Sequence, residues 1–219
     1  MTPAKSLKKM GHVVATLGYK AFASGRVFWI DGKQFHYFYH FYNNTYGAER
    51  CVEIPVVRSI LAAAKGGDVL EVGNVLEHYF RFPHDILDKY EKAPGVINQD
   101  VVEFAPGKKY STIISISTLE HVGFDEEVKD LEKPARAIEH LKSLLAVNGR
   151  LVVTVPLGYN PAIDSGIRDG HFGFHKIVAL KRKHFSEWCQ VSLDEAMQAK
   201  WARPYPCGNA IVIATYYSA

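Results

Sequence analysis

Short apolar runs separated by polar connections dominate the chain from Asp68 onward. Each run has the length of a strand and few polar positions, which is typical of a parallel sheet that is covered on both faces. The runs are DVLEVG (68–73), HDILD (84–88), STIISIS (111–117) and RLVVTVP (150–156). Two later runs, 176–182 and 209–217, predict strands that complete one edge of the sheet.

Helical spacing alternates with these runs. Residues 134–146 repeat apolar positions every three or four residues, and Asn148 and Gly149 are expected to end this helix before the next strand. Upstream, a helix is expected from Pro55 to Lys65, followed by Gly66 and Gly67. Only ten residues, 74–83, join the first two strands, so any helix between them must be short.

This alternation predicts an α/β fold with a mostly parallel, Rossmann-like sheet. The 219 residues suffice for one buried core and are short for two. We divide the chain into residues 1–66, an aromatic-rich extension with a helix, and residues 67–219, which hold the sheet. The extension contains HYFYHFY at 36–42 and is expected to pack over the ligand-binding edge of the sheet.

Composition and charge exclude several classes of protein. The chain is 47% hydrophobic and 22% charged, as in ordinary soluble enzymes, and its net charge of +3 is too small and dispersed for a nucleic-acid surface. Three widely spaced cysteines favour a reducing compartment, so we expect a cytoplasmic protein. No run approaches the ~20 apolar residues that span a bilayer. A basic N-terminal turn with Lys5, Lys8 and Lys9 leaves contact with a membrane surface open.

Polar residues follow the predicted strands at the edge where open α/β sheets bind ligands. Gly73 lets the backbone approach a ligand after the first strand. Asp88, 15 residues further on, can accept the hydroxyls of a ribose, or it is a surface acid paired with Lys89. Asp100 can accept a hydrogen bond from an adenine amino group, or it caps a turn.

The strand at 111–117 leads into a second group of candidates. His121, beside Glu120, is a candidate general base near neutral pH, with a capping or backbone-bonding role as the alternative. Tyr159 and Asn160, in the loop at 156–166, are candidates for substrate contacts, although turn formation alone would account for them. The histidines lack the spacing of a metal motif, and no metal site is expected.

Five elements together resemble a class I S-adenosylmethionine-dependent methyltransferase over about residues 66–217. They are EVGN (71–74), Asp88, Asp100, SISTLEHVG (115–123) and GRLVVTVP (149–156). More narrowly, YNNTYGAER (42–50), VEIP (52–55), DKYEKAPGVIN (88–98) and STLEHVG resemble small bacterial-type methyltransferase-like proteins linked to polysaccharide or sugar modification. The resemblance implies S-adenosylmethionine as the cofactor and a seven-stranded sheet of order 3-2-1-4-5-7-6, with its seventh strand antiparallel.

The resemblance also implies a set of cofactor-binding residues. The loop of Glu71, Gly73 and Asn74 would receive the methionine part, and Asp88, with its neighbour Lys89, the ribose. The adenine and the pocket lining would fall to Asp100, Ser117 and Leu119. If the segment with Tyr46 and Arg50 folds over the cofactor, Arg50 can pair with the methionine carboxylate.

The predicted reaction is O-methylation of a sugar or another small hydroxylated acceptor, with His121 as the base and Glu120 as its orienting neighbour. Two other functions stay open. An NAD-dependent oxidoreductase shares the strand, glycine and acid, but later glycines of its fingerprint would fall near Val75 and His78. A non-catalytic scaffold would expose an apolar patch around residues 36–46. The partner is a small-molecule or glycan acceptor, and an oligomer is left open.

Overall fold

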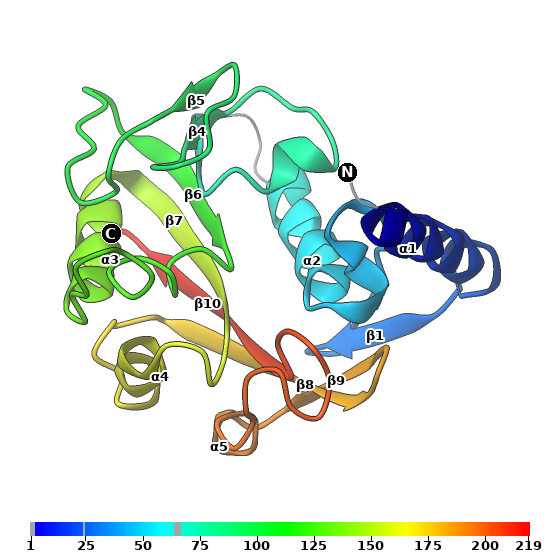
Figure 1. Cartoon of the computed structure of the whole chain (residues 1–219). Helices are drawn as coiled ribbons and strands as arrows, with labels where there is room; N and C mark the ends of the chain where they lie inside the picture. The colour runs from blue at the N-terminus through cyan, green and yellow to red at the C-terminus, as the bar shows by residue number, and fades with distance from the viewer. Residues whose placement is uncertain (1–2, 24, 64–66) are drawn as a thin grey trace.

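The chain folds around a mixed sheet of eight strands, in the order β5-β4-β3-β6-β7-β10-β8-β9 (Figure 1). The structure is a computed structural model that describes residues 3–23, 25–63 and 67–219. The strands are β3 (Val69–Val72), β4 (Asp85–Leu87), β5 (Val96–Ile97), β6 (Tyr110–Ile116), β7 (Leu145–Pro156), β8 (Lys176–His184), β9 (Glu187–Val191) and β10 (Ala210–Tyr217).

The strand directions divide the sheet into two parts. The pairs from β5 to β7 are parallel, whereas β10 is antiparallel to both β7 and β8, and β9 is antiparallel to β8. The predicted count of seven strands is wrong, because β9 adds an eighth strand at one edge and makes the sheet more mixed than expected. When β3 is numbered as the first strand and β9 is left out, the others run 3-2-1-4-5-7-6.

Most predicted strands lie where the apolar runs are, and the boundary before β7 is the exception. The helix α3 (Lys133–Ser143) ends earlier than expected, and β7 begins at Leu145, so Asn148 and Gly149 do not form a turn between them. Asn148 has a left-handed φ of 57°, and the pairing of β6 with β7 shifts register there. The two residues therefore form an irregularity inside the strand.

The connection between β3 and β4 contains only η2, a 3₁₀ helix of three residues (Leu76–His78). This confirms that the ten-residue link leaves no room for a longer helix. The chain thus crosses from β3 to β4 without the long helix that usually follows the first strand of a dinucleotide-binding fold.

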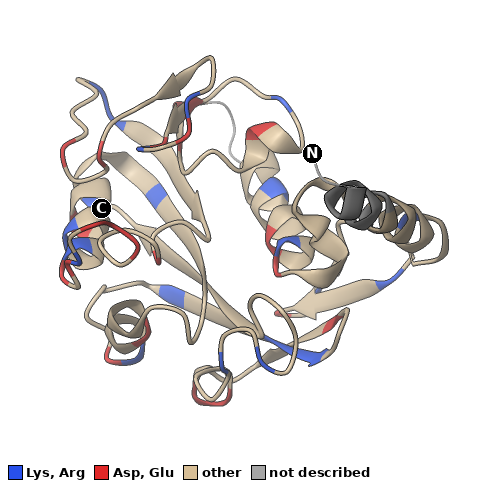
Figure 2. Cartoon of the chain, viewed as in Figure 1, with Lys and Arg blue, Asp and Glu red and all other residues tan. Residues whose placement is uncertain are grey.

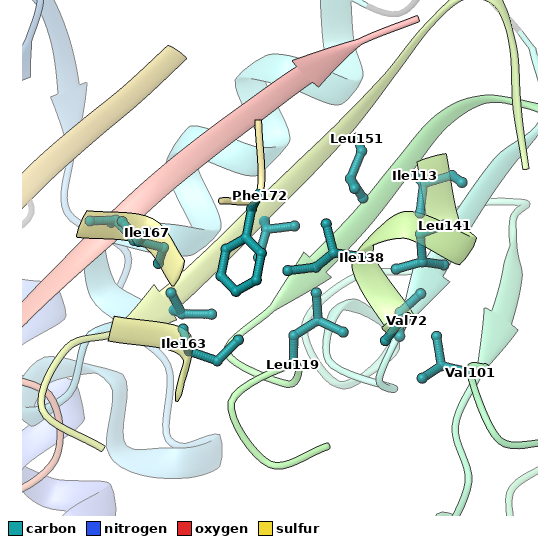
Figure 3. Packing of buried hydrophobic residues seen from close by; sticks show 14 of the residues in the cluster. Val72, Val101, Ile113, Leu119, Ile138, Leu141, Leu151, Ile163, Ile167 and Phe172 are labelled. Atoms are coloured by element: carbon teal, nitrogen blue, oxygen red, sulfur yellow. The ribbon is translucent and has the colours of Figure 1, made fainter. Parts of the chain in front are cut away.

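Mostly aliphatic side chains, together with the ring of Phe172, fill the space between the sheet and the helices α3 and α4 (Pro161–Arg168), which we call the α3 face (Figure 3). Ile138 and Leu141 of α3 and Ile163 of α4 are at most 1% exposed and pack with the fully buried Leu151 of β7. The short helix α5 (Leu193–Ala196) follows β9 and contributes the buried Ala196 to the same cluster.

The N-terminal region covers the opposite face of the sheet, which we call the α2 face. It consists of α1 (Pro3–Phe22), the hairpin of β1 (Val27–Ile30) and β2 (Lys33–His36), the 3₁₀ segment η1 (Tyr42–Gly47) and α2 (Arg50–Ala63) (Figure 1). Ile54 and Val57 of α2 pack against Ile114 and Ile116 of β6. The predicted N-terminal extension is therefore also part of the hydrophobic core, because it supplies the layer on the α2 face.

The helix α2 begins five residues before the predicted start at Pro55. The ring of Pro55 removes the N–H that would bond the carbonyl of Cys51, and that carbonyl instead accepts the N–H of Phe38 at 2.9 Å. A hydrogen bond from a distant segment thus satisfies the carbonyl group that Pro55 leaves without its usual partner in the helix. The predicted end at Lys65 and Gly66 lies outside the described residues.

The surface carries charge of both signs. Figure 2 shows acidic and basic residues interspersed over the helices, strands and loops of the described chain. In the same part of the molecule, no helix combines the length and the apolar character that crossing a membrane requires.

Candidate active site

A cavity of about 710 Å³ opens where the parallel strands β3, β4, β5 and β6 end. Its volume falls in the range of small-molecule sites, and its place is the one where open α/β sheets bind ligands. The lining residues are Val72, Gly73, Leu87, Asp88, Lys89, Tyr90, Glu91, Gln99, Asp100, Val101, Thr118, His121, Val122, Asp125 and Glu126.

Gly73 forms the part of the lining where two strand ends come closest. Its φ is +87°, and a Cβ there would lie 2.2 Å from the hydroxyl oxygen of Thr118. Any side chain at this position would therefore collide with the turn after β6. Glycine is required both by the backbone conformation and by the close approach.

Glu71 lies beneath this loop and does not line the cavity. Its buried carboxylate accepts the N–H groups of Val75 at 3.1 Å and Leu76 at 2.8 Å, and it lies 2.8 Å from Nε2 of His84. Burial opposes a charge on His84, but its hydrogen bonds to Glu71 and the Phe82 carbonyl prevail and raise its pKa. Glu71 thus fixes the path of the chain after Gly73.

Asp88 ties the end of β4 to the same loop. One carboxylate oxygen accepts the N–H of Asn74 at 3.1 Å, and the other accepts those of Tyr90 and Glu91 at 2.9 and 2.8 Å. A carboxylate has about four acceptor positions, so roughly one remains for a ligand. The alternative of a surface pair with Lys89 is wrong, because Lys89 bonds to other acids.

Those acids belong to an ionic network along one wall. Asp100 lies 2.6 Å from Nζ of Lys133 and 2.8 Å from Nζ of Lys89, and both lysines also pair with Glu126. Burial acts against the charge on Asp100, yet the two ammonium groups outweigh it and lower its pKa to about 2. Asp100 also accepts the N–H of Val102 at 3.2 Å, so the predicted turn-capping alternative is present as well.

His121 also lines the cavity and is held by Asp125, a residue that was not among the predicted site residues. Its Nδ1 lies 2.5 Å from Oδ2 of Asp125, and the hydroxyl of Tyr159 donates to the same oxygen at 2.5 Å. Burial acts to raise the pKa of Asp125, but these two hydrogen bonds outweigh it and lower that pKa. The spacing of four residues between His121 and Asp125 was the available signal for the pair.

Glu120 does not line the cavity and is 1% exposed. Burial raises its pKa well above the ordinary value, and the nearby Arg50 guanidinium offsets this only in part. Its Oε1 lies 3.7 Å from Nε2 of His121, while its Oε2 has no hydrogen-bond partner among the described residues. Asp125, not Glu120, therefore makes the close contact with His121.

Ser117 and Leu119, expected in the lining, lie behind it. Ser117 has a left-handed φ of 40°, and its hydroxyl donates to Glu53 of α2 at 2.6 Å. Leu119 is fully buried in the α3 face. Thr118, between them, is the residue that lines the cavity.

The start of α2 brings a buried charged cluster to the same edge. Arg50 pairs with Glu53 at 2.5 Å, and Glu53 also accepts the hydroxyls of Ser117 and Thr154 at 2.6 Å each. Glu49 lies nearby, and burial, followed by the charge of Glu53, raises its pKa. Nε of Arg50 is buried without a partner among the described residues.

The remaining candidates, Tyr46 and Asn160, are buried outside the cavity lining. Tyr46 is buried and stacks on Tyr19 of α1 at 5.0 Å, outside the cavity lining. Asn160 is buried, donates to the carbonyl of Glu120 at 2.8 Å and caps α4 through the N–H of Ala162 at 2.9 Å. Asn160 therefore has the structural role that was its alternative, in turn and helix formation.

The comparisons with known proteins give similarity of structure alone. No protein-family model matches the chain, and no curated protein matches it. Over 74% of this chain and 83% of the other, the structure resembles the N-methyltransferase NodS from Bradyrhizobium japonicum WM9 in complex with S-adenosylhomocysteine, with 13% identity and a TM-score of 0.47.

Two further solved structures are similar to a comparable degree. TehB from Haemophilus influenzae aligns over 82% of this chain and 66% of its own, with 8% identity and a TM-score of 0.49. A possible histamine N-methyltransferase from Thermotoga maritima aligns over 74% of this chain and 87% of its own, with 14% identity and a TM-score of 0.43. At these identities and scores, the acceptors of those proteins do not transfer to this chain.

Proposed function

We propose that the protein is an S-adenosylmethionine-dependent methyltransferase that binds its cofactor in the cavity at the strand ends. The acid-rich lining carries this proposal. Five carboxylates line the cavity, and Lys89 is the only lysine or arginine among its described lining residues. Even with Lys133 behind the wall, negative charge is in excess, which suits a cofactor with a positively charged sulfonium.

The same cavity is poorly suited to a dinucleotide. A pyrophosphate binds to free N–H groups at the start of a helix. Here η2 has three residues, and the N–H groups of Val75 and Leu76 already donate to Glu71. Two phosphate charges would also meet the carboxylates of the lining, so an NAD-dependent oxidoreductase is disfavoured.

Groups that suit the two ends of the cofactor lie in or near the cavity. Asp88 and Asp100 support binding of the ribose and the adenine, as the sequence resemblance implied. The methionine end would require polar groups near Gly73, and buried atoms without partners among the described residues lie in that region: Oδ1 of Asn74, the hydroxyl of Tyr79 and Nε of Arg50. Such orphan atoms call for a ligand or water.

The acceptor, we propose, is a sugar or another small hydroxylated molecule. S-adenosylmethionine would supply the methyl group, and the protein would align the acceptor oxygen and take its proton. Asp125 holds Nδ1 of His121, which leaves Nε2 to receive that proton. Tyr159 keeps Asp125 in place through its hydroxyl.

Ligand binding tests the cofactor. S-adenosylhomocysteine should raise the melting temperature while NAD does not, with a stabilisation of about 2.7 kcal/mol at roughly 100 times Kd. Asp88→Asn should weaken cofactor binding by about 1 to 3 kcal/mol in calorimetry. Stabilisation by NAD alone would refute the proposal.

Turnover tests the base. His121→Gln should lower the release of S-adenosylhomocysteine with a panel of small sugars by about 10² to 10⁴-fold, with cofactor affinity unchanged. His171→Gln, at an exposed histidine outside the cavity lining, is the matched control. Full turnover in His121→Gln would place the base elsewhere.

The non-catalytic scaffold finds little support. It predicted an exposed apolar patch around residues 36–46, but Tyr37, Tyr39 and Tyr46 are buried in the α2 face. Phe41, at 57% exposed, is the large apolar side chain that this segment leaves in water.

A further inference from the structure

The helix α1 has one face that packs on the protein. Thr16 is 2% exposed, and Tyr19 stacks on Tyr39 and Tyr46 with ring centres 5.3 and 5.0 Å apart. The helix lies at the outer margin of the molecule, beside η1 (Figure 1). The inner face of α1 is therefore covered by the rest of the protein.

The other face of α1 turns apolar side chains to water. Val14 is 64% exposed, Leu17 is 60% exposed and Phe22, the last residue of the helix, is 93% exposed. Val14, Leu17 and Ala21 follow one another at spacings of three and four residues, so they form one row along the helix. Single exposed apolar residues are ordinary, but such a row marks a binding surface.

The charge of this helix is unlike that of the chain as a whole. Its sequence contains Lys5, Lys8, Lys9 and Lys20 and no aspartate or glutamate, whereas the whole chain has a net charge of only +3. A basic, acid-free helix with an apolar row has the composition of helices that lie in the interface of anionic membranes. Two copies of α1 packed side by side would instead bring like charges together.

We propose that α1 attaches the protein to the surface of a bilayer that contains anionic lipid. The row of Val14 and Leu17, together with Phe22, enters the boundary between headgroups and acyl chains, while the net positive charge of the helix sequence attracts it to the lipid charges. The helix keeps its contacts with Tyr39 and Tyr46, so the folded protein binds as it stands. This inference does not depend on the proposed methyltransferase activity.

Co-sedimentation of the full chain with vesicles tests the proposal. Binding to vesicles of phosphatidylcholine mixed with phosphatidylserine should be at least about tenfold tighter than to phosphatidylcholine alone, and it should weaken as salt is added. Absence of binding to the mixed vesicles would overturn the proposal. Equal binding to both vesicle types would overturn the role of the lysines and with it the proposal.

Variants locate the contact. Val14→Glu with Leu17→Glu should reduce binding to the mixed vesicles at least about tenfold. The matched control is Val128→Glu with Val147→Glu, since these valines are 80% and 78% exposed, one in the loop between β6 and α3 and the other in β7. Unchanged binding of the α1 variant, or an equal loss in the control, would contradict the assignment.

Two readouts keep the test decisive. If the double variant melts early, Phe22→Ser, at a side chain that is 93% exposed, should still weaken binding without a change in melting temperature. Analytical ultracentrifugation covers the other occupant of this face. A dimer that dissociates in the α1 variant, without any vesicle binding by the parent protein, would assign the row to a second copy of the chain.

Discussion

The two faces of the sheet are buried by different chemistry. The α3 face is filled by aliphatic side chains such as Leu141 and Leu151, neither of which is exposed. The α2 face adds stacked tyrosines and, where it reaches the strand ends, the buried ionisable groups Arg50 and Glu53. One face is packed mainly by apolar side chains, whereas the other also contains buried charged groups.

This difference shows where the protein has buried charged groups that apolar packing does not require. A buried ion pair rarely adds more stability than an apolar pair of similar volume, so its presence calls for another reason. The cluster of Arg50 and Glu53 is bonded to Ser117, which directly follows β6 and precedes the cavity residue Thr118. The buried charge of the α2 face therefore lies next to the loop that lines the cavity.

The largest expected effect is the loss of the carboxylate that pairs with Arg50. Glu53→Gln should lower the free energy of unfolding by about 3 to 5 kcal/mol, because it removes the carboxylate that is bonded to a buried guanidinium and leaves Glu49 as the remaining acid nearby. Urea denaturation monitored by circular dichroism measures this. The double variant Arg50→Met with Glu53→Leu should be less destabilised than Glu53→Gln, and an equal or greater loss would mean that the pair itself stabilises the fold.

A cavity in the α3 face should be costly but insensitive to pH. Leu141→Ala removes a fully buried side chain and should cost about 2 to 5 kcal/mol in urea denaturation. No ionisable group of the cluster on the α2 face is affected, so the loss should be the same from pH 5 to pH 8. A loss that varies with pH would show that the two faces are coupled.

The smallest effect is a gain. The pKa of Glu120 is raised by burial above its ordinary value of 4.5, so the folded chain holds this proton where the unfolded chain has lost it. Stability from the neutral carboxyl is fully present below pH 4.5 and is lost as pH rises toward the folded pKa. Glu120→Gln should therefore stabilise the protein at pH 8, because the neutral amide has no proton to lose and avoids a buried charge.

The same variant should be neutral at pH 4, where both folded and unfolded chains carry the proton. Urea denaturation at the two pH values provides the comparison, and Glu139→Gln, on the exposed side of α3, is a control without burial. Destabilisation of Glu120→Gln at both pH values would mean that the carboxyl makes a contact that the amide cannot replace.

Much of the sheet followed from the sequence because its strands are continuous apolar runs with few alternatives. The carboxyl ends of these runs also located Gly73 and Asp88, and both line the cavity, as does the predicted Asp100. Local periodicity failed at Pro55, where a hydrogen bond from Phe38 allows the helix to start earlier. A hydrogen bond between distant segments does not change the local spacing of apolar residues, so that spacing cannot predict it.

The candidate site was harder to predict in detail than its position. A left-handed turn at Ser117 sends its side chain to α2 and brings Thr118 to the cavity, and nothing in the run of residues announces that conformation. Lys89 beside Asp88 suggested a local pair, yet Asp100 and Glu126 are its partners. Pairing of charges depends on the tertiary fold, and neighbours in sequence are weak guides to it.

The eighth strand bears on the solubility of the molecule. β9 ends the strand order, and an outer strand offers its backbone to strands of other chains, the first step of aggregation. The N-terminal hairpin lies against it, where Asp31 and Gln190 exchange hydrogen bonds of 2.8 and 2.7 Å. The opposite edge, β5, is only two residues long and offers little to pair with. We therefore expect the short strand β5 at one edge of the sheet, and the N-terminal hairpin beside β9 at the other edge, to limit pairing with strands of other chains.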